Sequence, residues 1–322
     1  MGTVLASPTL RFLLRRLAQS AVVLFGVMVV VFSLVQLVPG DPVRIALGTR
    51  YTPEAYAVLR EASGLDRPLL LQFVNYLGSA VTGDLGVSFR SGQPVTALLT
   101  DRLPATFSLA FTGILIGLVI AVIAGTWAAL HEGRVSDMIV RVGSQFGVSI
   151  PDFWMGLLLI MIFSATLGLL PSSGYVPLSQ GLGPWLSHVI LPATAVGLVA
   201  GAIMTRYIRA AVLEVASMPY VRTAKSKGIA PRVVIARHIG RNALIPVLTI
   251  AGIQFATILG GVIVVEVVFA WPGLGSLVYN AVGVRDYPVI QGAVLLIAVI
   301  FLAVNLLVDL LYAVVDPRIR LS

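Results

Sequence analysis

The sequence of 322 residues contains no cysteine and only three histidines, at positions 131, 188 and 238. Without cysteine, the chain can form neither a disulfide bond nor a thiolate-rich metal site. It also contains no G-x-x-x-x-G-K-[ST] phosphate loop, no H-E-x-x-H pair and no Ser/His/Asp constellation. The sequence therefore predicts no catalytic, cofactor-binding or metal-binding residues, and we do not expect the chain to be an enzyme.

Charged residues are scarce as well. They make up 11% of the chain, against about 25% in an average soluble protein. In contrast, 58% of the residues are hydrophobic and the mean hydropathy is +0.98. A helix needs roughly 20 predominantly apolar residues to cross the hydrocarbon layer of a membrane, and six stretches meet this requirement. The composition predicts an all-α polytopic membrane protein with six transmembrane helices.

The six apolar stretches divide the chain into alternating spans and connections. The predicted spans are 17–38, 104–130, 142–168, 188–208, 246–268 and 289–313. The remaining segments are 1–16, 39–103, 131–141, 169–187, 209–245, 269–288 and 314–322. The first apolar run exceeds the 7–15 residues of a signal-peptide core, and no A-x-A site closes it, so we expect a retained helix.

The positions of Lys and Arg indicate the orientation, because cytoplasmic loops carry an excess of both. With the N-terminus inside, 15 of the 22 Lys and Arg residues lie in internal segments or at their edges. We therefore predict a multi-pass protein with both termini, 131–141 and 209–245 in the cytoplasm. A nucleic acid is not expected as a partner, since the basic stretch has almost no interleaved aromatic residues.

The long segment 39–103 is predicted to be external and to carry structure of its own. The stretch "YTPEAYAVLREASG" places Thr52 at an N-cap, Pro53 at the first helical position and Gly64 just past the helix end. The stretch "LLLQFVNYLGSAVTGDLG" follows, with apolar residues at helical spacing. Either a small layer of helices lies over the membrane face here, or a loop covers the ends of the spans.

The densest positive stretch is "YVRTAKSKGIAPRVVIARHIGRN", which contains no acidic residue. Ser217 and Pro219 are start signals, Gly228 is a stop signal, and Pro231 begins the next element. These signals predict a short helix over 219–227, a tight turn and a second helix. Two capped helices indicate a docking surface, because such a surface must hold its shape against a partner. The alternative is that the charges only anchor this loop inside.

The stretch "TAKSKG" resembles the EAA loop of ABC-importer permeases, in which an Ala followed four residues later by Gly marks the helix that docks into the ATPase subunit. Ala224 and Gly228 keep that spacing. Arg222 and Thr223 stand where the general pattern has Glu and Ala. The downstream Pro246 lies farther from the glycine than in the general pattern. Both departures resemble the dipeptide/oligopeptide branch of the family.

Other stretches resemble the same branch, in order along nearly the whole chain. They are "LVPGDP", "GDLGVSF", "RLPATFSLA", "IPDFWMGLLL", "LPSSGY", "LPATAVG" and "VEVVFAWPGLGSLVYNAVGVRDYPVIQG". The resemblance implies the type I ABC-importer permease fold, with six transmembrane helices in the lipid bilayer of a bacterial or archaeal inner membrane.

The resemblance also implies a function and partners. The chain would be the permease subunit of an ATP-driven importer for short peptides. Its partners would be a second, similar permease, two cytoplasmic ATPase subunits that bind ATP and magnesium, and an external substrate-binding protein. The alternatives are a permease for nickel or another small solute, and a stand-alone secondary transporter.

The residues implied in ATPase docking belong to the short helix and its turn. They are Tyr220, Arg222, Thr223, Ala224, Lys225, Lys227 and Gly228. At 100° per residue, Arg222 and Lys225 share one side of the helix. Ala224 is expected on another side, together with Tyr220 and Lys227.

Ionisable and polar residues within the predicted spans point to a translocation path, because a charge at mid-span costs about 2.5–3.5 kcal/mol. The candidates are Asp152, Glu266 and Asn305. If the third span runs through Pro151, Asp152 lies near its middle beside a kink. If that span starts near Phe153, Asp152 is an N-terminal residue favoured by the helix dipole. Glu266 either lines the path or braces an external turn.

Overall fold

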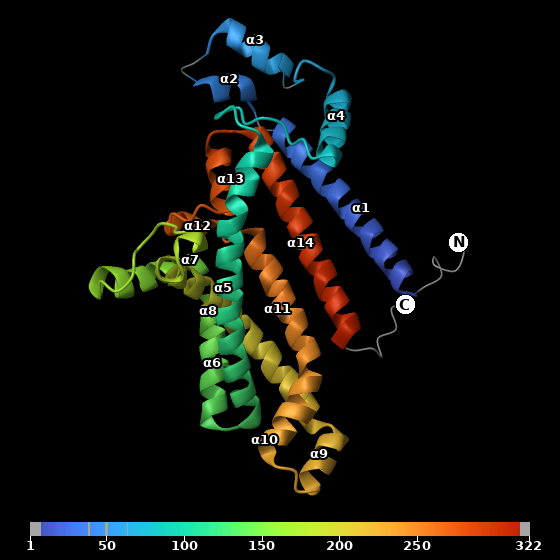
Figure 1. Ribbon diagram of the computed structural model, residues 1–322, viewed down its shortest axis with the longest axis vertical. Coiled ribbons are helices and arrows are strands. Elements are labelled where there is room, and N and C mark those ends of the chain that lie inside the picture. The colour runs from blue at the N-terminus through green and yellow to red at the C-terminus, as the bar shows by residue number, and fades with distance from the viewer. Residues whose placement is uncertain (1–7, 38, 49–50, 63, 316–322) are drawn as a thin grey trace. The chain divides into compact units, whose positions relative to one another are not determined.

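The computed structural model of the chain is built from helices (Figure 1). The structure describes residues 8–37, 39–48, 51–62 and 64–315. Within these ranges no β-strand forms, and the β pairing is one isolated bridge between Val87 and Pro94. The helices are α1 (Pro8–Leu37), α2 (Pro42–Leu47), α3 (Pro53–Ala62), α4 (Leu69–Thr82), α5 (Val95–Leu130), α6 (Val135–Ser149), α7 (Asp152–Leu159), η3 (Ile160–Thr166), η4 (Leu178–Gln180), α8 (Leu182–Ser217), α9 (Pro219–Ser226), α10 (Pro231–Val233), η5 (Val234–Gly240), α11 (Arg241–Gly261), α12 (Ile263–Val268), α13 (Leu274–Gly283) and α14 (Tyr287–Val315). The predicted all-α fold class is confirmed.

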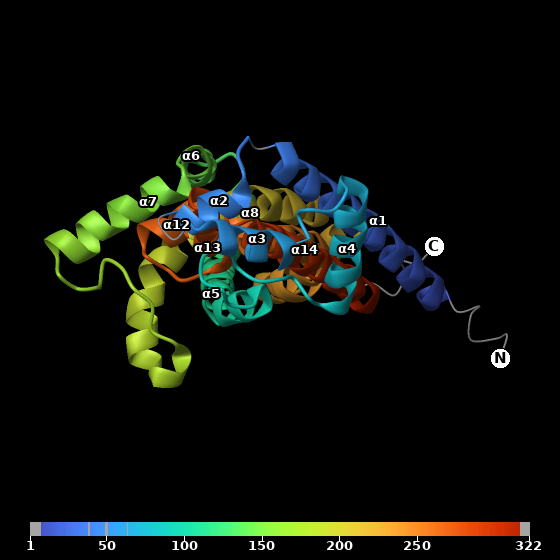
Figure 2. The same ribbon diagram turned by 90° about the horizontal axis from the view of Figure 1, so that it is seen from above.

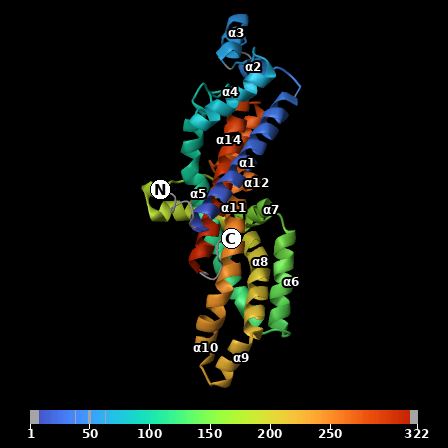
Figure 3. The same ribbon diagram turned by 90° about the vertical axis from the view of Figure 1, so that its right-hand side faces the viewer.

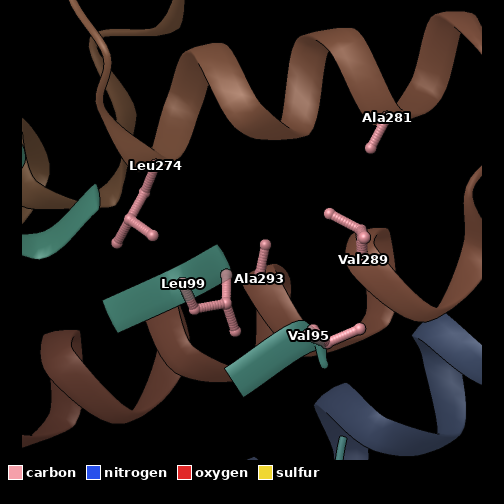
Figure 4. Close-up of a cluster of buried hydrophobic side chains, with 6 residues drawn as sticks. All are labelled: Val95, Leu99, Leu274, Ala281, Val289 and Ala293. Atoms are coloured by element: carbon pink, nitrogen blue, oxygen red, sulfur yellow. The ribbon is translucent and has the colours of Figure 1, made fainter. Parts of the chain in front are cut away.

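The chain forms two compact units. Of the described residues, those up to 106 and 272–302 make up the first unit, and 107–271 and 303–315 the second. In the first unit, α5, α13 and α14 each contribute aliphatic side chains to one core (Figure 4). The buried members are Val95, Leu99, Leu274, Ala281, Val289 and Ala293, each no more than 5% exposed. This core joins the beginning of α5 to chain segments far from it in the sequence.

The segment between α1 and α5 contains α2, α3 and α4, so it is helical, as one of the two sequence interpretations expected. Thr52 caps α3 as predicted, because its Oγ1 accepts a hydrogen bond of 3.1 Å from the backbone N–H of Ala55. Gly64 follows the end of α3 with φ +63°, a left-handed conformation that glycine adopts without strain. The local sequence signals therefore identified the start and end of this helix correctly.

Asp41 links α2 to α3. Its carboxylate accepts hydrogen bonds from the backbone N–H groups of Val43 (2.9 Å) and Arg44 (3.2 Å), and from the hydroxyl of Tyr56. Partial burial opposes ionisation of Asp41, but these hydrogen bonds and the nearby Arg60 outweigh it and hold the pKa of the carboxyl below its ordinary value. Asp41 is thus both the N-cap of α2 and a contact to α3.

A second carboxylate, Asp286, fixes the turn before α5. It is 3% exposed, and it accepts hydrogen bonds from Ser88 Oγ (2.5 Å), Phe89 N (3.1 Å) and Arg90 N (3.4 Å). A buried charge requires such partners, because leaving water without them is costly. The sequence did not indicate this contact, since almost two hundred residues separate its two sides.

Helix α8 is the centre of the second unit and packs against α6, α7 and α11. Figure 3 shows α8 lying between α6 and α11. It also approaches α5 closely, because a Cβ added at Gly117 would come within 2.8 Å of the carbonyl oxygen of Gly197. Small residues at such crossings let two helix backbones approach and are typical of membrane helices.

Among the described residues, five helices are long and apolar enough to cross a membrane, and a bent pair brings the number to six if it counts as one span. The pair consists of α6 and α7 with η3, which meet at an angle of 100° (Figure 2). The break follows from Pro151, which has no backbone N–H and restricts the preceding residue to an extended conformation. Ile150 has φ −88° and ψ 124°, as expected. The predicted span 142–168 is therefore not one continuous straight helix, because it is broken between Ser149 and Asp152.

Candidate functional site

The short helix predicted over 219–227 is confirmed as α9, Pro219–Ser226. Pro219 occupies the first turn, where its missing N–H has no intrahelical partner to lose. The expectation for Ser217 was wrong, because the N-cap residue is Met218. Ser217 is the last residue of α8, and its hydroxyl donates to the carbonyl of Glu214 at 2.7 Å. A single extended residue thus separates α8 from α9.

Gly228 ends α9 in the manner that its sequence predicted. Its φ is +73°, the left-handed conformation that favours glycine at a helix C-terminus. Its backbone N–H donates to Lys225 O at 3.0 Å, and that of Ile229 donates to Ala224 O at 3.3 Å. Together these two bonds form a Schellman ending. No described atom lies within 4 Å of the place where a Cβ would stand. The requirement for glycine is therefore one of backbone conformation and not of space.

The second predicted helix is present and begins at Pro231, as expected. It continues through α10, η5 and α11, and the middle part, Val234–Gly240, has the wider turns of a π-helix. Figures 1 and 3 show α9 and α10 side by side, joined by a short turn. Helix α9, helix α10 and the turn between them form one group of helices at the end of α8.

One side of α9 is buried within this group of helices. Val221 is 0% exposed and Ala224 is 5% exposed, and α9 packs against α8 and η5. Ala224 is thus buried, whereas Tyr220 and Lys227, which helical spacing places on the same side, are exposed. The hydroxyl of Tyr220 accepts a hydrogen bond of 3.0 Å from the side-chain amide of Asn242, which further fixes α9 to the following helix.

The other side of α9 is exposed and positively charged. Arg222, Lys225 and Lys227 are exposed, as are Tyr220 and Thr223. The residues of the predicted docking set thus fall into two groups. Ala224 and Gly228 shape and hold the helix, and the remaining members are accessible to a partner.

An ion pair that the sequence did not indicate connects α6 to α8. The carboxylate of Asp137 has a side-chain exposure of 2% and accepts two hydrogen bonds from one edge of the Arg209 guanidinium, from Nε at 2.7 Å and from Nη2 at 2.8 Å. The backbone N–H of Gly133 donates to the same carboxylate at 3.2 Å. Arg141 lies at 3.7 Å and is largely exposed. This bidentate contact fixes α8 against α6 shortly before α9 begins.

The three candidates for a translocation path lie on three helices. Asp152 is the first residue of α7, and its Oδ1 accepts from the backbone N–H of Phe153 at 2.7 Å, as expected of a residue at a helix N-terminus. Glu266 lies in α12 and is 3% exposed. Asn305 lies in α14 and is half-buried. Helices α7 and α12 pack against each other.

No metal site arises from these residues. Within the described part of the chain, no group of three His, Asp or Glu side chains is placed so that it could hold a metal ion. The features that the structure does assemble are the capped helix α9 with its positive side and the braced end of α8.

Comparison with known proteins identifies the family. Residues 121–321 match the model of the binding-protein-dependent transport system inner membrane component, and residues 9–110 match the model of its N-terminal part. The chain is similar to the di/tripeptide transport system permease protein DppB of Pseudomonas aeruginosa, with 39% identity over 97% of this chain and 99% of that protein. It is also similar to the glutathione transport system permease protein GsiC of Escherichia coli, with 41% identity over 97% of this chain and 99% of that protein.

A solved structure supports the same fold. The MetNI methionine ABC transporter in an inward-facing conformation contains a chain that matches 68% of this one and 96% of its own length, with a TM-score of 0.55 and 19% identity. The likeness concerns the fold alone. The family models together cover most of the sequence. The chain therefore belongs to the family of inner membrane components of binding-protein-dependent transport systems, which are multi-pass permeases of ABC importers.

Proposed function

We propose that this chain is the transmembrane permease subunit of an ATP-driven importer for short peptides. The observation that carries the proposal is α9, a short helix with a fixed end at Gly228 and an exposed positive side. The substrate class rests on the similar permeases of P. aeruginosa and E. coli, whose names refer to di/tripeptides and to glutathione. Nothing in these names favours a nickel permease or a secondary transporter.

The proposed importer contains a second permease, two ATPase subunits and an external substrate-binding protein. The ATPase subunits bind ATP and magnesium. In this assembly, Tyr220, Arg222, Thr223, Lys225 and Lys227 contact an ATPase subunit. Closure of the ATPase pair moves α9, and the packing of α9 on α8 transmits the movement to the spans. The ion pair between Asp137 and Arg209 supports this transmission, because it joins α8 to α6.

We place α9 and both chain termini in the cytoplasm of a bacterium or archaeon. The support is the distribution of Lys and Arg, which gather in the segments that this orientation places inside. The helices α2, α3 and α4 then lie on the external side, where the substrate-binding protein delivers the peptide. Asp152, Glu266 and Asn305 are the residues that we propose for the translocation path.

Purification from a mild detergent tests the proposal. We expect the tagged chain to co-elute with two ATPase subunits and a second permease. After reconstitution with its binding protein, the assembly should import labelled di- and tripeptides only when ATP is present on the side of α9. A chain that elutes alone, or that transports peptides along an ion gradient without ATP, would contradict the proposed function.

A further inference from the structure

Three arginines form a row on the helix that follows α9. They are Arg232 in α10, Arg237 in η5 and Arg241 at the start of α11, and all three are exposed. None of them belongs to α9 or to the docking residues that the sequence resemblance implies. The row, defined by these three residues, is thus a second positive feature of the segment between α8 and the span α11.

The π-helix η5 brings the three arginines into line. Arg232 and Arg237 are five residues apart, and Arg237 and Arg241 are four apart. In an α-helix, five residues turn through about 500°, which would leave Arg237 about 140° around the helix from Arg232. The backbone hydrogen bonds of a π-helix connect residues five apart, so its wider turns return Arg237 to the side of Arg232. The four residues to Arg241 then make about one turn of the α-helix that follows.

The buried side of the same helix supports this alignment. Val234, Ile239 and Ala243 are each no more than 3% exposed, and they repeat the steps of five and four residues. Each of them follows one arginine of the row by two positions. Because two residues make about half a turn of a helix, the row faces away from the side of η5 that packs against α8 and α9.

The positive charge of the row has no counter-charge close to it in the sequence. No Asp or Glu occurs between Glu214 and Glu266. Among the residues that the structure describes, none of the three arginines forms an ion pair. Guanidinium groups about one helical turn apart repel one another and together attract an anionic surface. The row is therefore suited to a negatively charged partner outside this chain.

The direction of the row distinguishes a protein from a membrane as this partner. Arg241 directly precedes the apolar, charge-free run of α11, so it lies near the hydrocarbon boundary, and the row leads away from the membrane. From Arg241 to Arg232 the helix rises by roughly 12 Å, since an α-helix rises about 1.5 Å per residue and wider turns rise less. The headgroup region on one side of a bilayer is only about 5–7 Å thick. Lipid phosphates therefore reach Arg241, whereas Arg232 lies beyond them.

We propose that the row binds an acidic surface of the ATPase subunit, as a contact separate from that of α9. The inference rests on the proposed function, which supplies an ATPase subunit on this side of the membrane. Carboxylates about one helical turn apart fit the row, because a guanidinium binds a carboxylate through two parallel hydrogen bonds. The row lies on the helix that continues into α11. Movement of the ATPase subunit thus reaches this span directly, whereas α9 acts through its packing on α8 and η5.

A zero-length cross-link tests the contact without removing a charge. A carbodiimide joins a lysine to a carboxylate only where the two are in contact, and the only lysines of this chain are Lys225 and Lys227, both in the α9 segment. Arg237→Lys places a third lysine in the row. Arg134→Lys is the matched control, at an exposed position that the proposed orientation places on the same side of the membrane. In the assembled transporter we expect Arg237→Lys to couple to an Asp or Glu of the ATPase subunit, and Arg134→Lys not to couple.

Charge reversal measures the strength of the contact. The row variant is Arg232→Glu/Arg237→Glu, and its matched control, Arg134→Glu/Arg206→Glu, makes the same change of charge at two other exposed arginines. The permease pair in nanodiscs of phosphatidylethanolamine and phosphatidylglycerol is titrated with the ATPase subunit at increasing salt. We expect the row variant to bind at least about tenfold more weakly at low salt and to lose less affinity as salt rises, because salt screens exposed charges. The control should bind as the original protein does.

The two native lysines keep this inference distinct from the proposed function. Cross-links from Lys225 and Lys227 to the ATPase subunit, with none from Arg237→Lys and with unchanged affinity of the row variant, would overturn the inference and leave the proposed function standing. No binding of the ATPase subunit by the original protein would overturn both. Loss of bound phosphatidylglycerol from the row variant in native mass spectrometry, with unchanged ATPase affinity, would show that lipid occupies the row and would also overturn the inference.

Discussion

Replacing Arg209 by alanine is expected to destabilise the second unit, because the carboxylate of Asp137 would remain buried without its main partner. The side chain of Asp137 is 2% exposed and that of Arg209 is 19% exposed. Removal of one member of a buried ion pair costs about 3–5 kcal/mol. The remaining hydrogen bond from Gly133 and the distant Arg141 offset part of this loss. We therefore expect a cost of about 3 kcal/mol, at the lower end of that range.

A double-mutant cycle, made of Asp137→Ala, Arg209→Ala and the variant with both substitutions, separates the cost of the unpaired buried charge from the cost of the lost packing. In Asp137→Ala/Arg209→Ala no charge is left buried, so the double variant should be more stable than Arg209→Ala alone, by about 1–2 kcal/mol. Arg141→Ala serves as the control, because its side chain is 57% exposed and an exposed pair contributes only about 0–1 kcal/mol.

Thermal unfolding of the purified permease in one detergent, followed by circular dichroism, measures these differences. The reasoning would be refuted if Arg209→Ala unfolded at the same temperature as the original protein. It would also be refuted if the costs of the two single substitutions simply added in the double variant, since the two residues would then not be coupled.

Two further predictions concern Gly228 and Asp41. The Gly228→Val permease should reach normal levels in the membrane, but the transporter should hydrolyse ATP without importing peptide. A β-branched residue at φ +73° costs about 1–2 kcal/mol or more and shifts the end of α9. Normal import by this variant would contradict the prediction, and Gly228→Asn, which tolerates that conformation, is the control. The lowered pKa of Asp41 means that its contribution to the stability of α2 and α3 is complete above about pH 4 and is lost as the pH falls through the lower folded-state pKa. Protection of these helices from hydrogen exchange, measured relative to the intrinsic exchange rate at each pH, should therefore fall below about pH 4. Equal protection in Asp41→Asn and in the original protein at every pH would refute this role.

The features that the sequence predicted correctly are local ones. The start of α3 at Thr52, the turn at Gly228 and the helix between Pro219 and that turn each depend on a few neighbouring residues. The long apolar runs likewise predicted helices, because hydrophobic length and backbone hydrogen bonding leave few other structures in a membrane.

The remaining features depend on contacts between distant parts of the chain. Asp137 and Arg209 are 72 residues apart, and Asp286 and Ser88 are 198 residues apart, so no local pattern could pair them. The burial of Ala224 follows from the packing of α9 on α8 and η5, which helical spacing alone does not specify.

Ser217 illustrates an ambiguity of a different kind. A serine before a helix is a common N-cap, but a hydroxyl can equally donate to a carbonyl of the preceding turn. Here α8 continues up to Ser217, and the hydroxyl donates to Glu214 O. The sequence offers both possibilities, and the end of α8 decides between them.

The central claim is that the positive side of α9 contacts an ATPase subunit. The most direct measurement is the amount of ATPase subunit that co-purifies with Lys225→Glu/Lys227→Glu, compared with Arg134→Glu, an exposed arginine that the proposed orientation places on the same side of the membrane. Because Lys225 and Lys227 are exposed, the double variant should unfold at the same temperature as the original protein. We predict that it loses the ATPase subunits and that Arg134→Glu retains them. Full retention by the double variant, with normal ATP-dependent import, would contradict the account.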